Sequence, residues 1–270
     1  MNITKNLTII GESIAAEHTS FYIPELKILL DCGIKCKSKV EYIFITHSHW
    51  DHTKALPDII LEADNKPVIY IVNYIFDTIS NFLSSVVKLN SCNNTLSYSS
   101  YCILNQLNNK DNINIKFNKS NNYNIVTYNC DHDVPTIGYG FIEIRNKIKD
   151  EYKDLDKSKI IDLKKSNVEI TKQVYYPRFV FLGDTTINIL HNTDILSVGY
   201  ETIIIECTLL YTSDKLGRKM HIHWDQLKSI IIKNSDIKFI LIHFSAKYKK
   251  EEIITFFKKE DVINAIPYFI

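Results

Sequence analysis

Cysteine is sparse in this chain, and no two cysteines have the C-x-x-C spacing of a structural zinc site. The six among 270 residues are Cys32, Cys36, Cys92, Cys102, Cys130 and Cys207. Disulfide frameworks belong to small secreted domains, whereas a chain of this length buries a large core without covalent cross-links. The composition therefore predicts reduced thiols and excludes a disulfide-stabilised mini-protein.

Glycine, proline and an excess of charge of either sign are also scarce. With 7 Gly and 6 Pro, the chain has too little of either for a fibrous or linker-dominated protein, and 45% hydrophobic residues exclude global disorder. The 32 Lys plus Arg and 31 Asp plus Glu give a net charge of +1, so the chain as a whole does not attract polyanions. We expect any contact with nucleic acid to come from local patches.

The N-terminus has the pattern of neither a signal peptide nor a membrane span. Its first ten residues, MNITKNLTII, have one lysine before a short apolar run, and Glu12, Glu17 and His18 follow soon after. We therefore expect a protein that does not enter the membrane and that resides in the cytoplasm or in another soluble intracellular compartment.

Apolar strand-like runs alternate with helix-like stretches along the chain, which is typical of an α/β layered fold. The expected strands are 26–30, 42–46, 68–72, 123–128, 137–144, 179–182, 202–205 and 237–242. The expected helices are 53–63, 74–88, 224–233 and 249–259. The length and the absence of an internal repeat favour a single domain over residues 1–270.

Two segments depart from this alternation. Residues 88–124 hold 12 Asn among 37 positions, a composition that favours turns and mobility. Residues 145–172 carry nine Lys or Arg and six Asp or Glu between two expected strands. We expect both segments to be excursions from the domain, the second one a solvated stretch on the surface.

The densest group of potential metal ligands is the segment THSHWDH at 46–52, directly after an expected strand. It contains His47, His49, Asp51 and His52. Alternate residues at a strand end point the same way, so His47 and His49 share a side, while the turn into the next helix can direct Asp51 and His52 to a second position. Imidazole and carboxylate donors without thiolate suit zinc, manganese or iron. One short segment can thus serve two adjacent ions.

Two metal ions need more ligands than this segment supplies, and later strand ends provide them. His132 follows the strand expected at 123–128, Asp184 follows the one at 179–182, and His243 ends the one at 237–242. Each lies where an apolar run meets a loop. The sequence therefore predicts that these three side chains join the first segment in one metal centre.

These motifs resemble the metallo-β-lactamase superfamily, whose members share a four-layer αβ/βα sandwich. The resemblance covers about residues 31–248. Within the superfamily, four strings resemble ribonuclease Z, the endonuclease that trims the 3′ end of precursor tRNA, more than they resemble β-lactamases or glyoxalases. They are HDVPTIGY at 132–139, FLGDT at 181–185, ECTL at 206–209 and HFSAKY at 243–248.

The resemblance implies two divalent metal ions, zinc or manganese, and a division of the ligands between them. The ligands of one ion are His47, His49 and His132, those of the second are Asp51, His52 and His243, and Asp184 bridges both.

The resemblance also implies phosphodiester hydrolysis. Two neighbouring cations lower the pKa of a shared water, which makes hydroxide available as a nucleophile near neutral pH. Asp51 would both ligate and accept the water proton, and His221, polarised by Glu206, would protonate the departing ribose oxygen. His223 lies close by, so the sequence leaves open which histidine donates the proton. Asp31 would anchor the site without binding metal.

Three departures from ribonuclease Z bear on the substrate. Trp50 stands where the family usually has Gly, and a bulky ring there would narrow the site. Lys247 stands where Arg is common, which keeps the charge and loses the bidentate fork for phosphate. Ribonuclease Z grips tRNA with a long Gly- and Pro-rich arm before the Gly-Asp-Thr strand, and residues 145–172 lack that composition. Whether their lysines replace the arm stays open.

The preferred interpretation is a dinuclear metal-dependent phosphodiesterase, an endoribonuclease that resembles the short form of ribonuclease Z and acts on precursor tRNA or other small RNAs. As partners we expect RNA and a second copy of the chain, because ribonuclease Z relatives are commonly homodimers. The alternative is a phosphodiesterase of a small cyclic nucleotide or similar ester, which needs the same metals and no RNA-gripping arm. A non-catalytic RNA-binding relative is disfavoured by the complete ligand set.

Overall fold

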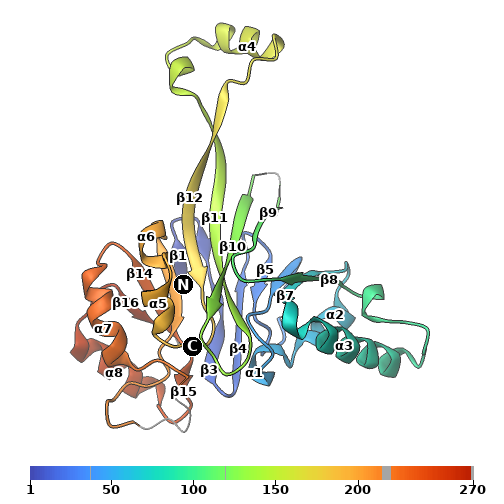
Figure 1. Ribbon diagram of the computed structural model, residues 1–270, viewed down its shortest axis with the longest axis vertical. Helices are drawn as coiled ribbons and strands as arrows, with labels where there is room; N and C mark the ends of the chain where they lie inside the picture. Colours follow the sequence, from blue (N-terminus) through green and yellow to red (C-terminus); the bar gives the residue numbers. More distant parts are fainter. Residues whose placement is uncertain (37, 119, 215–219, 269–270) are drawn as a thin grey trace.

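Two facing seven-stranded sheets form the centre of the molecule in the computed structural model (Figure 1), which describes residues 1–36, 38–118, 120–214 and 220–268. The first sheet contains β3 (Ile10–Ala15), β4 (His18–Ile23), β5 (Ile28–Leu30), β6 (Tyr42–Phe44), β7 (Val68–Val72), β8 (Ile103–Leu107) and β15 (Phe244–Ser245). Its strand order is β15-β3-β4-β5-β6-β7-β8. A separate two-stranded sheet pairs β1 (Asn2–Thr4) with β2 (Leu7–Thr8).

The second sheet carries the later half of the chain. It contains β9 (Asn112–Lys116), β10 (Asn122–Cys130), β11 (Thr136–Ile148), β12 (Thr171–Phe181), β13 (Thr202–Glu206), β14 (Lys238–Ile242) and β16 (Ala265–Pro267). Its strand order is β16-β14-β13-β12-β11-β10-β9. In β13, Ile204 joins the core between the sheets, while Ile203 and Ile205 join the core under the helices, as the two-residue period of a strand requires.

Helices cover the outer faces of both sheets (Figure 1). Those beside the first sheet are α1 (Trp50–Thr53), α2 (Leu56–Glu62) and α3 (Phe76–Ser91), with the 3₁₀ turns η1 (Asn73–Ile75) and η2 (Tyr98–Ser100). Those beside the second are α5 (Asn188–Asn192), α6 (Ile195–Val198), α7 (Trp224–Lys233) and α8 (Lys250–Glu260). The order of layers confirms the predicted four-layer sandwich. Within the described ranges, no helix combines the length and the apolar character needed to cross a membrane.

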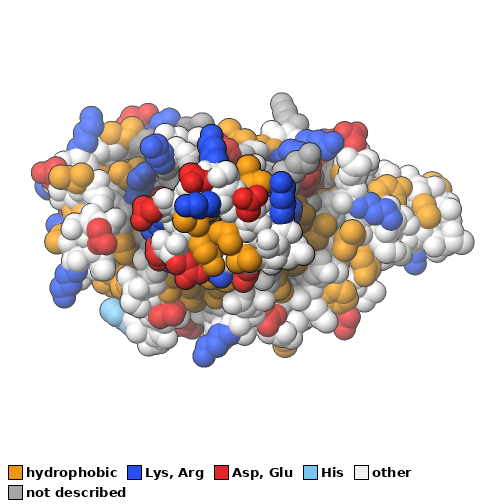
Figure 2. All heavy atoms as spheres, turned by 90° about the horizontal axis from the view of Figure 1, so that it is seen from above, with side chains coloured by type: hydrophobic (Ala, Val, Ile, Leu, Met, Phe, Trp, Pro, Cys, Tyr) orange, Lys and Arg blue, Asp and Glu red, His pale blue; other side chains and the backbone are white. Residues whose placement is uncertain are grey.

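Residues 145–172 form an arm that projects from the body (Figure 1). Strands β11 and β12 stay paired to Ile148 and Thr171, and the 3₁₀ turn η3 (Asp150–Tyr152) and α4 (Lys157–Lys165) form the tip. Seen from above in Figure 2, Lys and Arg alternate with Asp and Glu around apolar side chains at this end. The strands extend beyond the predicted limits because a two-stranded ribbon with both faces in solvent needs no apolar run.

The Asn-rich segment 88–124 is more ordered than its composition predicts. It contains β8 at the edge of the first sheet and β9 at the edge of the second. The prediction of turns was wrong for these two stretches, because an edge strand exposes one side to water and tolerates polar side chains there.

Candidate metal centre and active site

The HxHxDH segment lies in the connection from β6 to α1. Strand β6 ends at Phe44, and α1 begins at Trp50. Asp51 and His52 therefore lie in the first turn of a short helix, whereas the sequence predicted a turn and a helix that begins at Thr53. His47 and His49 precede the helix, so the change of backbone direction separates the two pairs of side chains.

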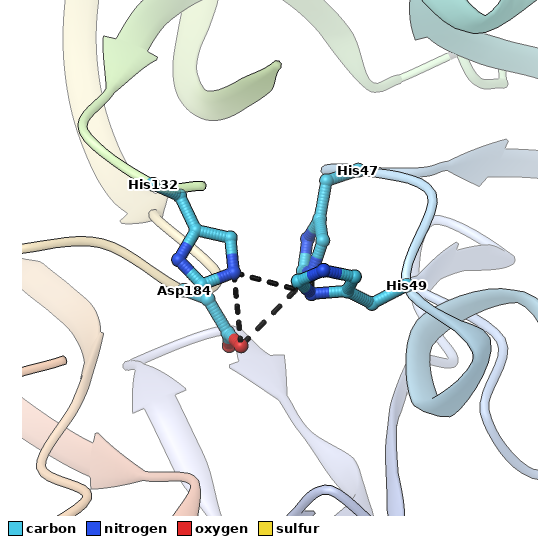
Figure 3. A group of neighbouring side chains, drawn as sticks. All are labelled: His47, His49, His132 and Asp184. Carbon is cyan, nitrogen blue, oxygen red and sulfur yellow. Dashed lines mark hydrogen bonds and ion pairs between the residues drawn. The ribbon is translucent and has the colours of Figure 1, made fainter. Parts of the chain in front are cut away.

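His47, His49, His132 and Asp184 point toward one another (Figure 3). The Nδ1 atom of His49 is 3.1 Å from Nε2 of His47 and 3.2 Å from Nε2 of His132. The Oδ2 atom of Asp184 is 3.9 Å from Nε2 of His47 and 3.8 Å from Nε2 of His132. One potential ligand atom from each residue thus faces a common point.

A second group, Asp51, His52 and His243, adjoins the first. The Oδ2 atom of Asp51 is 3.6 Å from Nε2 of His52 and 3.7 Å from Nε2 of His243. Asp184 lies between the groups, with Oδ1 3.4 Å from His52 Nε2 and Oδ2 3.3 Å from His243 Nε2. The structure therefore brings together all seven side chains that the sequence predicted as ligands.

Three polar atoms in this cluster are buried without a hydrogen-bond partner among the described residues. They are Nε2 of His52, Nε2 of His243 and Oδ1 of Asp184. Burying such atoms unpaired is costly, and a divalent cation would satisfy them together. The set of imidazoles and carboxylates without thiolate fits zinc or manganese. The residues present therefore fit a divalent metal centre.

Asp31 orients the ligands His47 and His52 through hydrogen bonds on the side of each ring that faces away from the cluster. Its Oδ2 atom accepts a 2.8 Å hydrogen bond from Nδ1 of His52, and its Oδ1 atom accepts one of 2.8 Å from the backbone N–H of Thr46. The Thr46 hydroxyl donates to the same carboxylate and lies 2.9 Å from Nδ1 of His47. Each imidazole N–H is thereby turned away from the centre, and Nε2 keeps its lone pair for a metal.

Thr208 does the same for His243, a function that was not predicted from the sequence. Its hydroxyl donates to Glu206 Oε2 at 2.6 Å and lies 3.1 Å from Nδ1 of His243. The signal that could have found it is the Glu-x-Thr spacing at the end of β13, because side chains two residues apart in an extended chain share a side.

Burial and charge favour the metal-binding protonation states of two of the ligands, His47 and Asp184. Burial and the neighbouring imidazoles hold the pKa of His47 well below its usual range. For Asp184, burial alone would raise the pKa, but the charges of His243 and His52 outweigh it and hold the pKa of Asp184 well below the usual range. A neutral imidazole and an ionised carboxylate are the forms that bind metal.

His221 and Glu206 form a pair beside the cluster. The Nδ1 atom of His221 is 3.0 Å from Oε1 of Glu206, and the ring centroid is 5.3 Å from that of His132 and 5.4 Å from that of His243. Burial lowers the pKa of His221, but the hydrogen bond and charge of Glu206 outweigh this and raise the pKa to about 9. His223 instead begins α7 as its N-cap residue. The structure thus places His221, of the two candidates, at the cluster.

Gly183, which follows β12 of the second sheet, approaches Thr46, which follows β6 of the first sheet, beside the cluster. Its φ of +62° lies in the left-handed region, and a Cβ there would lie 2.8 Å from Oγ1 of Thr46. Only glycine allows this approach, which places Asp184 opposite the segment that follows β6.

The two substitutions relative to ribonuclease Z lie outside the cluster. Trp50 is 62% exposed and meets Phe82 of α3 edge to face, so its indole is not buried among the ligands. The Nζ atom of Lys247 is 2.6 Å from Oδ1 of Asp214 and 4.9 Å from the centroid of the Tyr248 ring. Its charge is therefore paired within the protein.

Comparison with known proteins agrees with the motifs and the geometry. A model of the metallo-beta-lactamase superfamily matches residues 37–76, which include the HxHxDH segment. The tRNase Z TRZ1 of Arabidopsis thaliana is 28% identical over 268 residues, which cover 95% of this chain and 90% of that protein. The ribonuclease Z of Methanocaldococcus jannaschii is 28% identical over 269 residues, with coverages of 85% and 80%.

The fold also matches a solved structure. The crystal structure of the short form of human tRNase Z, ELAC1, superposes with a TM-score of 0.55 at 15% sequence identity, covering 97% of this chain and 96% of that one. The motifs, the matched segment and the shared fold together identify the chain as a metallo-β-lactamase-fold protein that resembles ribonuclease Z.

Proposed function

We propose that this chain is a metal-dependent endoribonuclease that removes the 3′ trailer of precursor tRNA with two divalent metal ions, zinc or manganese. The observation that carries the proposal is the position of Asp184 between two groups of ligands, each with histidine nitrogens facing its carboxylate. The tRNase Z name of the Arabidopsis relative supports RNA as the substrate.

Two groups of side chains would hold the ions. The ligands of one would be His47, His49 and His132, those of the other Asp51, His52 and His243, with Asp184 shared. When bound, a pair of divalent cations supplies Lewis-acid chemistry that lowers the pKa of water and neutralises charge on a phosphoryl oxygen.

The remaining steps belong to the protein's own side chains. Burial raises the pKa of Asp51, but the charges of the neighbouring His52 and His243 outweigh it and hold the carboxyl ionised, so it can accept a proton from the attacking water. His221, with Nδ1 held by Glu206, would donate its Nε2 proton to the departing ribose oxygen. A protonated imidazole at neutral pH is available for this because its pKa is raised.

The arm supports an RNA substrate and weakens the small-ester alternative. Residues 145–172 lack the Gly- and Pro-rich composition of a ribonuclease Z arm, yet they still form a projecting hairpin (Figure 1). On α4, Lys157, Lys164 and Lys165 form no ion pair with any described residue, which leaves three cations for phosphates.

The arm and the cluster lie at opposite ends of one hairpin. Strand β11 begins beside the His132 loop and runs for 13 residues to the arm, about 40 Å at about 3.4 Å per residue. An RNA that contacts both must span this length, or must contact the arm of one copy and the cluster of another. This separation supports our proposal of a homodimer.

The deciding experiment is incubation with a precursor tRNA that carries a 3′ trailer, followed by mapping of the product ends. We expect cleavage just after the discriminator base and close to two equivalents of zinc or manganese per chain, both lost in Asp184→Ala. Protein without metal would contradict the proposal. Hydrolysis of a small cyclic nucleotide with no cleavage of the tRNA would favour the alternative.

A further inference from the structure

Trp50, which stands between two proposed metal ligands in the sequence, exposes a large apolar surface to water. The side chain is 62% exposed, although its backbone lies between two proposed ligands, His49 and Asp51. The other tryptophan of the chain, Trp224, is 3% exposed and donates a hydrogen bond to Glu260. The two tryptophans thus differ, and the exposed face of Trp50 is free to contact a ligand.

The indole is held in place from one side. Its ring meets that of Phe82 edge to face, with centroids 6.2 Å apart and planes at 72°. Phe82 lies on the helix α3 of sixteen residues, and its neighbour Leu83 is fully buried in the core. An aromatic ring supported in this way presents its remaining surface with little freedom to lose on binding.

We propose that Trp50 stacks on an unpaired nucleobase immediately beside the scissile phosphate. The inference rests on the proposed RNA substrate and adds a residue that positions it. Unpaired bases of RNA are commonly bound by stacking on aromatic rings, and every base offers a face for this. Because the backbone of Trp50 lies between two proposed ligands, His49 and Asp51, we place the stacked base in a nucleotide near the cleaved bond.

The test combines protein variants with RNA that lacks one base. For Trp50→Ala we expect kcat/KM on precursor tRNA to fall about tenfold to hundredfold, mainly through KM, as base stacking predicts. Trp50→Phe should retain most of the activity. Leu89→Ala, which removes an 80% exposed apolar side chain from α3, should leave the kinetics unchanged.

An abasic ribose placed in turn on either side of the scissile bond identifies the partner. On the RNA that lacks the stacked base, Trp50→Ala should have no further effect, because the interaction is already absent. The proposal would be overturned if Trp50→Ala lowered kcat/KM by the same factor on both abasic RNAs as on the intact RNA. So would a loss of RNA binding that accompanies dissociation of a dimer, since the indole would then lie between copies of the chain.

Fluorescence provides a readout of Trp50 that does not depend on turnover. A precursor RNA with a methylphosphonate at the cleavage site should quench the emission of the wild type and leave that of Trp50→Phe unchanged, because Trp224 is buried. If the wild type cleaves RNA but shows no such quenching, and if its kinetics equal those of Trp50→Ala, the stacking is refuted while the proposed function stands. A wild type that neither binds nor cleaves RNA would refute both the stacking and the proposed function.

Discussion

Asp31 and His52 are joined by a 2.8 Å hydrogen bond between Oδ2 and Nδ1, and both side chains are completely buried. Asp31 directly follows β5, while His52 belongs to α1. The same carboxylate also accepts the backbone N–H of Thr46, the residue before His47. One buried acid therefore fixes both the strand end and the helix that carry the HxHxDH segment.

We expect Asp31→Asn to lower metal affinity about 10-fold to 100-fold, as loss of a partner that orients a ligand usually does. Asp31 has a φ of +53°, and asparagine tolerates this left-handed conformation, so the substitution removes charge without straining the backbone. Competition with a chromophoric chelator measures the affinity. The control is Asp58→Asn, at an exposed acid on α2. Equal affinities of wild type and Asp31→Asn would show that Asp31 does not support the ligands.

His221→Ala should slow the release of a poor leaving group far more than that of a good one. A general acid contributes about 10²-fold to 10⁴-fold to the rate, and p-nitrophenolate leaves without protonation. We expect the larger loss with precursor tRNA and the smaller with bis-p-nitrophenyl phosphate. His223→Ala, at the N-cap of α7, is the matched control and should affect both substrates alike. The same loss of rate on both substrates in His221→Ala would exclude it as the acid.

Glu143 should stabilise the base of the arm in a pH-dependent way. Burial raises its pKa, but the hydrogen bonds and charges of Arg145 and Arg178 outweigh this and hold the pKa of Glu143 below its usual range. A carboxylate with a depressed pKa in the folded state contributes stability above its unfolded pKa of 4.5 and loses that contribution as the pH falls through the folded value.

We therefore expect Glu143→Gln to lower the free energy of unfolding by about 1.5–3 kcal/mol at pH 7, the range for hydrogen bonds to charged groups, and by less toward pH 3. Chemical denaturation at both pH values, with a chelator present so that metal release does not contribute, measures the difference. Glu169→Gln on the arm, whose side chain is 84% exposed, is the control. A loss of the same size at both pH values would contradict the assignment.

Replacing Lys157, Lys164 and Lys165 on α4 by Gln should weaken RNA binding and leave hydrolysis of bis-p-nitrophenyl phosphate unchanged. If each lysine contacts one phosphate, the slope of log affinity against log salt should fall by about 2. Gln at Lys233, Lys258 and Lys259 on α7 and α8 removes as much charge elsewhere and should change the slope little. Unaltered RNA affinity in the α4 variant would favour the small-ester alternative.

The elements that carry the ligands could be predicted because their sequences repeat a simple pattern. The strands β6 and β14 are short apolar runs. Strand β6 ends at Phe44, three residues before His47, and β14 ends at Ile242, directly before His243. Strands β3 and β4 were missed, because polar residues such as Glu12 and Ser13 interrupt their apolar positions. The helices α5 and α6 have five and four residues, too few to show a helical period.

The seven ligands could be named from their motifs, but their supporting residues could not. Thr46 and Thr208 are unremarkable in sequence, and their function depends on hydroxyls that bridge an acid and an imidazole across different strands. The proton donor could not be chosen from the sequence, because His221 and His223 are only two residues apart. The structure separates them, since His223 is the N-cap of α7 and His221 lies against Glu206.

The metal centre lies at the junction of the two sheets, since His47 and His49 follow a strand of the first and His132 and Asp184 follow strands of the second. An ion held there is a cross-link between two halves of the molecule, and an ion that binds only the folded chain shifts the equilibrium away from unfolding by mass action. Resistance to heat and to proteolysis should accordingly rise and fall with the supply of the ion.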